Sequence, residues 1–408
     1  MTLKRALLAA ALAAVAALAI HALHGPWPGR SGGGPRQPFA GHTQRTPVDW
    51  PTYGFDSART HAAPFALAPP FRVVWKQTGD WSLIEFPPIV VDGRLYVGTN
   101  HGLVVALDSA SGRVIWRREL GRCVASSPAL AAGLVLVGVM ASPPHCDEDV
   151  PSYLVALDAR TGRTRWLYRS GGPVETSPLV AGDLVVFGSW DGRVDAVDTH
   201  GRRRWSFQTK AAVKAGAALW HSTVYAGSYD GFVYALDARS GRLRWRAAAG
   251  GRFYATPSVD EGRVIAATTD GVVHAFAAGS GAPLWSRRIG RFAYSAPALA
   301  DGRAFVGSYD HRLYALDAQT GRVLWTAAGP GPVSGAPTVL AGLVYFSTCG
   351  SCSSYESNPK ARQTFAVDEA AGALRWRFRD GEYSPVVTDG IRLYLTGYTA
   401  IYALEPVR

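Results

Sequence analysis

The chain has 408 residues, of which 48% are apolar and 11% aromatic, so it is too rich in core-forming residues for a disordered protein. Glycine (45 residues) and proline (26) are frequent, which favours an all-β fold with many turns. The net charge of +11 comes mostly from arginine and suits anionic partners, although a coding bias toward arginine explains the same composition.

The first 23 residues form a targeting signal. Lys4 and Arg5 precede an apolar run over 6–20, whose length lies between a signal peptide and a membrane span. Residues 17–19 (Ala-Leu-Ala) resemble a cleavage site. We expect an uncleaved anchor in a bacterial cell membrane, or a secreted or periplasmic protein if the signal is cleaved. Both outcomes place the body outside the cytoplasm, which excludes nucleic acid as a partner.

The stretch 24–48 is rich in glycine and proline and is typical of a flexible linker. The globular part therefore spans 49–408. Within it, tryptophan recurs at intervals of about 40 residues, which indicates a propeller or another repeat array. These residues are Trp75, Trp116, Trp166, Trp205, Trp245, Trp285, Trp325 and Trp376.

Each repeat predicts a four-stranded antiparallel sheet. In the unit 128–166, strands are expected at 128–130, 134–139, 153–158 and 164–166. A glycine turn joins the last two strands, and an aspartate before it accepts hydrogen bonds from the turn amides. Ala277 and Glu405 replace this aspartate, so the turns of units five and eight should be weaker. The recurrent tryptophan is interpreted as a wedge between neighbouring sheets.

Seven complete units end at Trp116 through Trp376, and three further strands remain, at 384–387, 392–396 and 401–404. Their missing fourth strand is available at 71–75. Pairing the two ends of the chain would remove two exposed edges. The sequence therefore predicts an all-β, eight-bladed propeller of four-stranded blades, closed by an N-terminal strand.

The segments 234–245 and 314–325 (Tyr-Ala-Leu-Asp-Ala followed by a Gly-Arg turn and Trp) resemble the pyrroloquinoline-quinone (PQQ)-like repeat. The stretch 49–54 (Asp-Trp-Pro-Thr-Tyr-Gly) is similar to the lead-in of that family. The resemblance covers 49–408 and implies the propeller. The family holds PQQ-dependent dehydrogenases and a non-enzymatic, BamB-like branch of envelope scaffolds, and the resemblance alone does not choose between them.

Variable residues are predicted to gather at one end of the central channel. The position three residues before each first-strand proline differs from blade to blade, as a binding site does and a packing column does not. The candidates from this column are Glu85, Glu175, Lys214, Tyr254, Tyr294 and Glu382. Solvated or mutually paired polar residues would give the same column, and Glu175 with Lys214 would then be a simple salt bridge.

Aromatic residues in the loops between second and third strands fall on the same face: Trp190, Tyr229, Tyr309 and Tyr398. Aromatics around a polar mouth suit a peptide, a sugar or a planar ring. Their other interpretation is that they only cover hairpin turns, since Asp-Gly follows Trp190 and Tyr229.

Two long loops, 141–152 and 351–362, are insertions on this face, and all four cysteines lie beside them. We expect disulfides in an exported protein: Cys123 with Cys146, and Cys349 with Cys352. A four-cysteine zinc site and a redox role for the Cys-Gly-Ser-Cys motif are the alternatives.

No catalytic motif is present, and the adjacent cysteines, aspartate and calcium ligands of the PQQ enzymes have no counterpart. We therefore expect no catalytic residue, no metal and no cofactor, with PQQ and Ca²⁺ only under the alternative of a quinoprotein dehydrogenase. The expected function is a monomeric, membrane-tethered scaffold that binds an envelope protein or peptide. A carbohydrate or small-ligand sensor is the other alternative.

The turn side of the propeller should face the membrane. The closing strand starts on that side, so the linker arrives there. An arginine lies near almost every turn, which predicts a basic rim against an anionic membrane surface: Arg113, Arg163, Arg202, Arg242 and Arg322.

Overall fold

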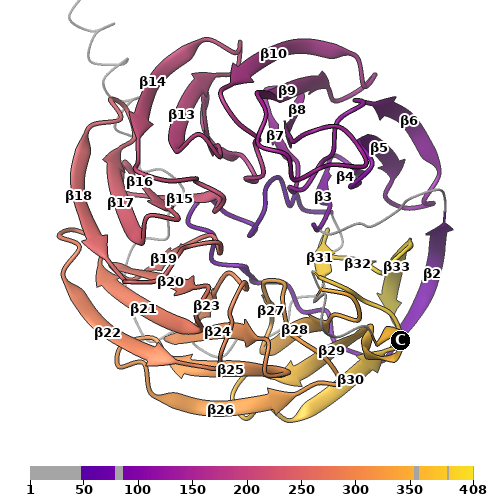
Figure 1. Cartoon of the computed structure of the whole chain (residues 1–408). Helices are drawn as coiled ribbons and strands as arrows, with labels where there is room; N and C mark the ends of the chain where they lie inside the picture. The colour runs from indigo at the N-terminus through magenta and orange to yellow at the C-terminus, as the bar shows by residue number, and fades with distance from the viewer. Residues whose placement is uncertain (1–46, 79–85, 353–357, 384–385, 408) are drawn as a thin grey trace, which may run out of the picture. The chain divides into compact units, whose positions relative to one another are not determined.

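The computed structural model describes residues 47–78, 86–352, 358–383 and 386–407. They belong to one compact unit, Pro38–Arg408. Eight antiparallel sheets of this unit stand around a common centre, which confirms the predicted eight-bladed propeller (Figure 1).

The blades follow one another in chain order, and each begins with its innermost strand. Blades one to four comprise β3 (Ile89–Val91), β4 (Arg94–Gly98), β5 (Leu103–Asp108) and β6 (Val114–Glu119); β7 (Ala129–Ala131), β8 (Leu134–Val139), β9 (Ser152–Asp158) and β10 (Thr164–Ser170); β11 (Leu179–Ala181), β12 (Leu184–Gly188), β13 (Arg193–Asp198) and β14 (Arg203–Gln208); and β15 (Ala217–Trp220), β16 (Thr223–Gly227), β17 (Phe232–Asp237) and β18 (Leu243–Ala248).

Blades five to seven repeat this order. They comprise β19 (Ser258–Asp260), β20 (Arg263–Thr268), β21 (Val272–Ala277) and β22 (Pro283–Arg288); β23 (Ala298–Ala300), β24 (Arg303–Ser308), β25 (Arg312–Asp317) and β26 (Val323–Ala328); and β27 (Thr338–Leu340), β28 (Leu343–Thr348), β29 (Gln363–Asp368) and β30 (Leu374–Phe378). A single 3₁₀ turn within the described ranges, η1 (Pro359–Ala361), precedes β29.

The eighth blade joins the two ends of the chain. The strand β2 (Phe71–Thr78) pairs antiparallel with β33 (Ala400–Pro406). On its other side β33 pairs with β32 (Leu393–Thr396), which in turn pairs with β31 (Val386–Thr388). The register places Phe71 opposite Pro406 and Thr78 opposite Ala400. This is the predicted closure, and it leaves β33 without a free edge because both of its sides are paired.

The recurrent tryptophan fastens each blade to the next. The Trp245 indole N–H donates to the Ala278 carbonyl of the following blade at 2.9 Å. A Cβ added to Gly281, in that blade's turn, would lie 2.5 Å from the Trp245 ring, so the ring rests directly on the glycine. The wedge interpretation is thereby supported, and Trp376 differs because it packs edge-on against Phe71, at 5.2 Å between ring centroids.

The aspartate of each turn acts as the sequence predicts. In blade four, the Asp237 carboxylate accepts hydrogen bonds from the Ser240 amide (2.9 Å) and hydroxyl (2.8 Å). Blade five has Ala277 at this position and keeps the backbone bonds of the turn, among them the bond from the Gly281 amide to the Ala277 carbonyl, at 2.7 Å. The backbone turn therefore forms without the carboxylate but has fewer hydrogen bonds.

The centre of the ring is filled by residues 47–63, which we term the hub segment (Figure 1). Its backbone or side chains reach all eight innermost strands or their flanking residues, and β1 (Ala62–Ala63) pairs in parallel with β27. Carbonyl oxygens of the hub accept the amide of the innermost strand in six blades: Val90 to Trp50, Leu130 to Pro51, Leu219 to Ser57, Val259 to Ala58, Leu299 to Thr60 and Val339 to His61, all at 2.7–3.1 Å.

Arg59 is the most buried charge of the hub, with no exposed surface. Its guanidinium donates to the carbonyls of Ala217 (3.0 Å), Pro178 (3.0 Å) and Tyr53, and to the Thr52 hydroxyl (2.7 Å). Burial lowers the pKa of Arg59 to about 10, which still leaves it charged at neutral pH. A cation in this place therefore collects carbonyl groups of blades three and four and of the hub itself.

Candidate functional site

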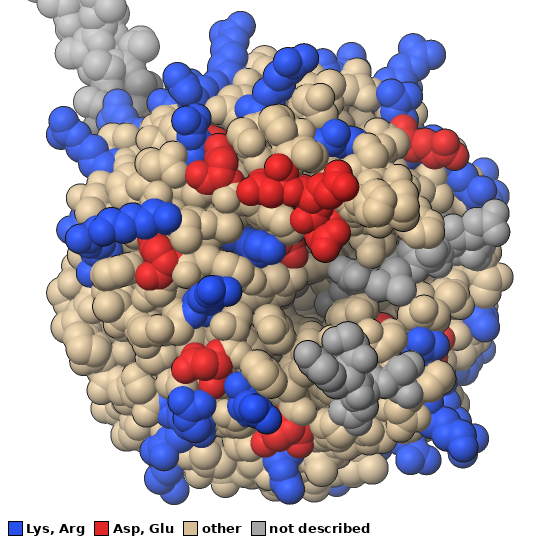
Figure 2. Space-filling model, in the orientation of Figure 1, with Lys and Arg blue, Asp and Glu red and all other residues tan. Residues whose placement is uncertain are grey.

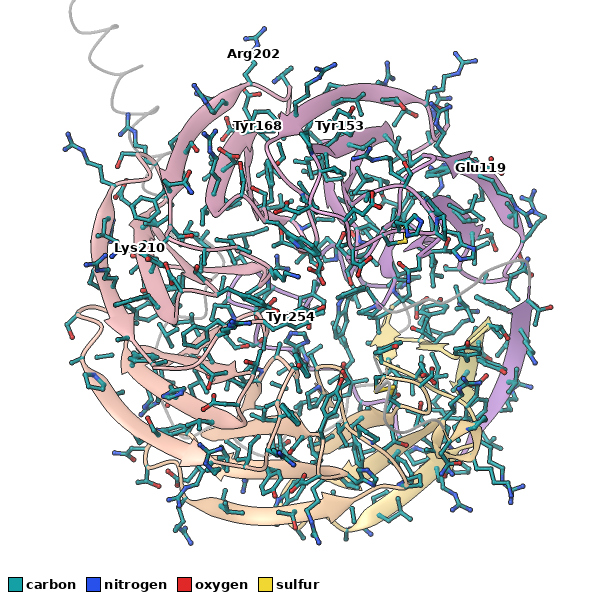
Figure 3. All side chains as sticks on the ribbon, in the orientation of Figure 1. Glu119, Tyr153, Tyr168, Arg202, Lys210 and Tyr254 are labelled. Atoms are coloured by element: carbon teal, nitrogen blue, oxygen red, sulfur yellow. A yellow bond between two sulfur atoms is a disulfide. The ribbon has the colours of Figure 1, made fainter. Side chains whose placement is uncertain are left out.

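The hub closes the central channel, so the predicted channel mouth is a cup-shaped depression whose base is formed by the hub segment. A cavity of about 50 Å³ lies between Tyr53 of the hub and the side chains that precede the innermost strands. Its walls include Glu175, Lys214, Tyr254 and Tyr294, from blades three to six. The structure thus brings together four members of the predicted column, and Tyr254 lies near the centre of the ring (Figure 3).

Glu175 is the central acceptor of this cup. Its two carboxylate oxygens take hydrogen bonds from the Tyr254 hydroxyl (2.5 Å) and the Trp190 indole N–H (2.9 Å). Burial raises the pKa of Glu175, and the nearby Lys214 ammonium opposes that rise. The carboxylate is thus held by three residues from three blades.

Lys214 is the cation of the same cup. Its ammonium lies 3.8 Å from a Glu175 carboxylate oxygen and 3.3 Å from the centre of the Trp190 ring. Burial lowers the pKa of Lys214, while Glu175 and the acidic Asp149 and Asp147 act in the opposite direction. The predicted salt bridge exists, but it is part of a larger polar and aromatic cluster.

A ladder of tyrosines continues from this pair around the mouth. The rings of Tyr254 and Tyr294 meet edge-on at 5.2 Å, and those of Tyr294 and Tyr309 at 5.1 Å. Tyr229 lies 6.5 Å from Tyr254 on the other side. Because the contacts run from blade to blade, the aromatics do more than cover their own hairpins.

A second polar group lies at blades seven and eight. Glu382, which is 1% exposed, pairs with the Arg362 guanidinium at 3.0 Å and accepts the Ser351 hydroxyl at 2.6 Å. The Arg362 guanidinium stacks on the Tyr398 ring at 3.4 Å. The Tyr309 hydroxyl, 3.5 Å from the Cys352 carbonyl, connects this group with the tyrosine ladder.

Disulfides attach both inserted loops to the mouth. Cys123 is joined to Cys146 and Cys349 to Cys352, and no described cysteine is free. The blade-two insertion carries the exposed Asp147, Glu148 and Asp149. Figure 2 shows acidic side chains gathered beside the central hollow of this face, with basic side chains spread around the periphery.

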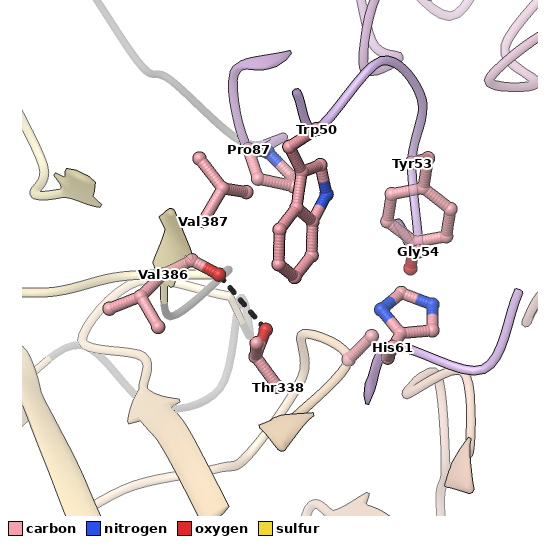
Figure 4. Close-up of a pocket in the computed structure, with 9 residues that line it drawn as sticks. Trp50, Tyr53, Gly54, His61, Pro87, Thr338, Val386 and Val387 are labelled. Carbon is pink, nitrogen blue, oxygen red and sulfur yellow. Dashed lines mark hydrogen bonds between the residues drawn. The ribbon is translucent and has the colours of Figure 1, made fainter. Parts of the chain in front are cut away.

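The hub residues were missed as a group by sequence reasoning. Trp50 and His61 lie on either side of a narrow space of about 10 Å³ under blades seven and eight (Figure 4). Burial lowers the pKa of His61 to about 3, so the ring is neutral. The lead-in motif was visible at 49–54, but its hydrogen-bond partners in the blades lie as far as 126 residues away, at Pro178, and no local signal predicts them.

Several predicted features lie outside the described residues. These are Glu85, the signal or anchor over 1–23, and the linker up to residue 46. The ranges that the structure does describe contain no helix with the length and hydropathy of a membrane span. The anchor therefore stays a prediction.

We find no site that fits a metal ion in the described ranges. No three His, Cys, Asp or Glu side chains come together there. Glu175 and Glu382 are each engaged by a cation and by hydroxyl or N–H donors, so a calcium ion would have to displace these partners. The described mouth residues thus do not form the ligand set that the quinoprotein alternative requires.

Comparison with known proteins identifies the family. A family model described as outer membrane protein assembly factor BamB matches residues 66–142, 149–218, 190–291 and 269–405. Among solved structures, BamB from Moraxella catarrhalis is similar with a TM-score of 0.65 and 18% identity, over 83% of this chain and 98% of that one. This likeness shows a common fold.

Enzymes share that fold. A quinohemoprotein alcohol dehydrogenase from Pseudomonas putida HK5 has a TM-score of 0.70 at 14% identity, over 89% of this chain and 81% of that one. In sequence, the 1-butanol dehydrogenase (cytochrome c) of Thauera butanivorans is 38% identical over 74 residues. That match spans 17% of this chain and only 11% of the enzyme.

These relatives correct one prediction. The sequence predicted no cofactor, because the adjacent cysteines, the aspartate and the calcium ligands of the PQQ enzymes have no counterpart in it. The proteins that the chain resembles include a quinohemoprotein and a cytochrome c-linked dehydrogenase, so this prediction is wrong. The absence of the paired cysteines and calcium ligands is evidence about one kind of site only.

Proposed function

The chain belongs to the family of the outer membrane protein assembly factor BamB, and from this we propose that it is an exported scaffold of the cell envelope. In this proposal, the mouth of the propeller binds a protein or a peptide. The N-terminal segment tethers the propeller to the membrane, and the turn side faces the lipid.

The observation that carries the proposal is the aromatic cluster of the mouth. Trp190, Tyr229, Tyr254, Tyr294 and Tyr309 form one connected set that surrounds the Glu175–Lys214 pair. Tyrosine, tryptophan and arginine dominate the binding energy of protein interfaces, because each offers a large apolar surface with a polar tip. A half-buried ion pair at the centre adds selectivity against partners of the wrong charge.

The inserted loop of blade two supports the same function. The Cys123–Cys146 disulfide holds it beside the mouth, so a partner would meet a preformed wall and less ordering entropy would be lost on binding. The acidic tip of the blade-two loop, Asp147–Asp149, favours a partner segment with basic residues next to its apolar anchor.

The test of partner binding is a pull-down from the native membrane with the full chain. We expect Trp190→Ala and Lys214→Ala to lose the captured partner by at least ten-fold. Arg117→Ala, at an exposed residue of the outer strand β6, is the matched control and should capture it as the wild type does. Equal capture by all variants would refute binding at the mouth.

Membrane tethering is tested separately. The turn-side arginines Arg113, Arg163, Arg202, Arg242 and Arg322 are exposed, and Arg202 projects from the rim in Figure 3. Each basic residue near an anionic bilayer adds about 1 kcal/mol of attraction. Protein lacking residues 1–45 should therefore bind anionic vesicles at low salt and release them at high salt. Failure to bind the vesicles would contradict the proposal that the turn side of the propeller faces the membrane.

A quinoprotein dehydrogenase is the second candidate, favoured by the local match to 1-butanol dehydrogenase. It predicts that added PQQ with Ca²⁺ gives a bound quinone absorbance and alcohol-dependent dye reduction. A saturable quinone signal that Trp190→Ala abolishes would favour the enzyme over the scaffold.

A further inference from the structure

The Cys349–Cys352 disulfide differs chemically from the other disulfide of this face. Cys123–Cys146 packs with Ala125, Met140 and Phe86, and the Cys146 sulfur lies 3.7 Å from a neutral acceptor, the Asn100 carbonyl oxygen. Cys349, which is 1% exposed, has its sulfur 3.3 Å from a carboxylate oxygen of Glu382. Cys352 is half-buried and is therefore the sulfur that an attacking group meets first.

The contact with Glu382 favours the reduced pair. A disulfide sulfur carries no proton, so the oxidised pair cannot donate to the carboxylate. After reduction the Cys349 thiol can donate to it across the same 3.3 Å. A disulfide whose reduced form gains an interaction is a stronger oxidant.

Glu382 is also placed to move a proton. Arg362 and Ser351 hold the carboxylate in position, at 3.0 Å and 2.6 Å. Burial raises the pKa of Glu382, which makes it a better proton carrier near neutral pH than an exposed carboxylate.

We propose that Cys349–Cys352 is a thiol–disulfide exchange site for a protein dithiol, with Glu382 as the proton carrier for Cys349. The Glu382 carboxylate takes the proton of the partner's first thiol, and the resulting thiolate attacks the Cys352 sulfur. A mixed disulfide forms, the Cys349–Cys352 bond breaks, and the leaving Cys349 thiolate takes that proton from Glu382. The partner's second thiol then loses its proton to water, its thiolate attacks the partner's first sulfur, and Cys352 leaves as a thiolate that is protonated from water.

The exchange is balanced. The partner dithiol loses two electrons and two protons and becomes a disulfide, while Cys349 and Cys352 become thiols. The reverse reaction with an oxidised disulfide, such as oxidised glutathione, restores the site. This inference does not depend on which partner binds the mouth.

The full chain is equilibrated in glutathione buffers of graded composition, quenched in acid and alkylated with a mass-tagged maleimide. Peptide mass spectrometry then reports each cysteine pair. We expect Cys349–Cys352 to open at a reduced-to-oxidised glutathione ratio at least ten-fold lower than Cys123–Cys146. If both pairs open together, or Cys123–Cys146 opens first, the proposal is overturned.

The role of Glu382 is tested by rates. Glu382→Gln should slow the opening of Cys349–Cys352 by a reduced dithiol peptide at least ten-fold. Glu369→Gln is the control. Glu369 is a buried glutamate at the turn end of blade seven, where it pairs with Arg303 at 3.4 Å. Equal rates in both variants would overturn the assignment of Glu382. The order of opening in the wild type is measured independently of whether Glu382→Gln folds.

Discussion

Two tryptophans of blade three show how position decides the role of a residue. Trp205 is 7% exposed, and its indole N–H donates to the Ala238 carbonyl of the next blade, at 2.8 Å. Trp190 is half-buried and donates to the side chain of Glu175 while its ring covers the Lys214 ammonium. The first tryptophan recurs in every blade, and the second does not.

The difference teaches that recurrence separates packing from chemistry in a repeat protein. A residue that appears in all blades has a function that all blades need, which is packing against the neighbouring blade. A residue that appears once interacts with other singular residues, as Trp190 does. The turn end of a blade therefore carries the recurrent packing residues, and the mouth end carries the residues that differ between blades.

Mutation of the two tryptophans to alanine should give the largest difference in the free energy of unfolding. Trp205→Ala should lower the free energy of unfolding by about 3–5 kcal/mol, since it leaves a cavity between blades three and four. Trp190→Ala should cost about 1 kcal/mol or less, because its ring is partly exposed. Urea denaturation followed by circular dichroism measures both, and equal losses would contradict the division.

Glycine substitutions sharpen the description of the turn end. Gly241 has φ of 68°, and an added Cβ would lie 2.7 Å from the Trp205 ring. Gly241→Ala should therefore cost about 2–3 kcal/mol, from left-handed strain plus overpacking. Gly250 has φ of 84° with no atom within 4 Å of the added Cβ, so Gly250→Ala should cost about 1 kcal/mol. Equal thermal unfolding of the two variants would mean that the ring contact contributes nothing.

The turn aspartate can be removed from one blade and added to another. Asp237→Ala should destabilise by about 1 kcal/mol through the loss of its hydrogen bonds to Ser240. Ala277→Asp should stabilise blade five by about 0.5–1 kcal/mol, since Ser280 offers the same donors. A destabilising Ala277→Asp would show that the backbone turn alone accounts for blade five.

The carboxylates of the two ends should respond to pH in opposite directions. Hydrogen bonds from Arg244 and Ser240 lower the pKa of Asp237 to about 2, so its contribution is present above pH 4 and is lost as the pH falls toward 2. Burial raises the pKa of Glu175, so its contribution is present below about pH 4 and is lost as the pH rises through the raised value.

Urea denaturation across pH 2–8 tests this contrast, with expected effects of about 1 kcal/mol or less. Asp237→Asn should flatten the acid limb of the stability profile, and Glu175→Gln should flatten the limb above pH 4. If either variant left its limb unchanged, the assignment of that limb would be wrong.

Particular residues mark the limit of sequence reasoning. The column that contains Glu175, Lys214, Tyr254 and Tyr294 was found by aligning the repeats, because equivalent positions in a propeller face the same axis. The hydrogen bonds of Glu175 to Tyr254 and Trp190 were not predicted, since they depend on the rotation between blades. The contact of Glu382 with Cys349 was not predicted for the same reason.

Local patterns in this chain determine the blades, the turns and the closing strand, because each of these features is written within about 40 residues or is repeated eight times. The centre of the propeller is decided only when the chain is folded. Residues 47–63 contact every blade, and Arg59 collects carbonyl oxygens up to 158 residues away. Such contacts produce no repeating pattern in the sequence, because one segment makes each of them only once.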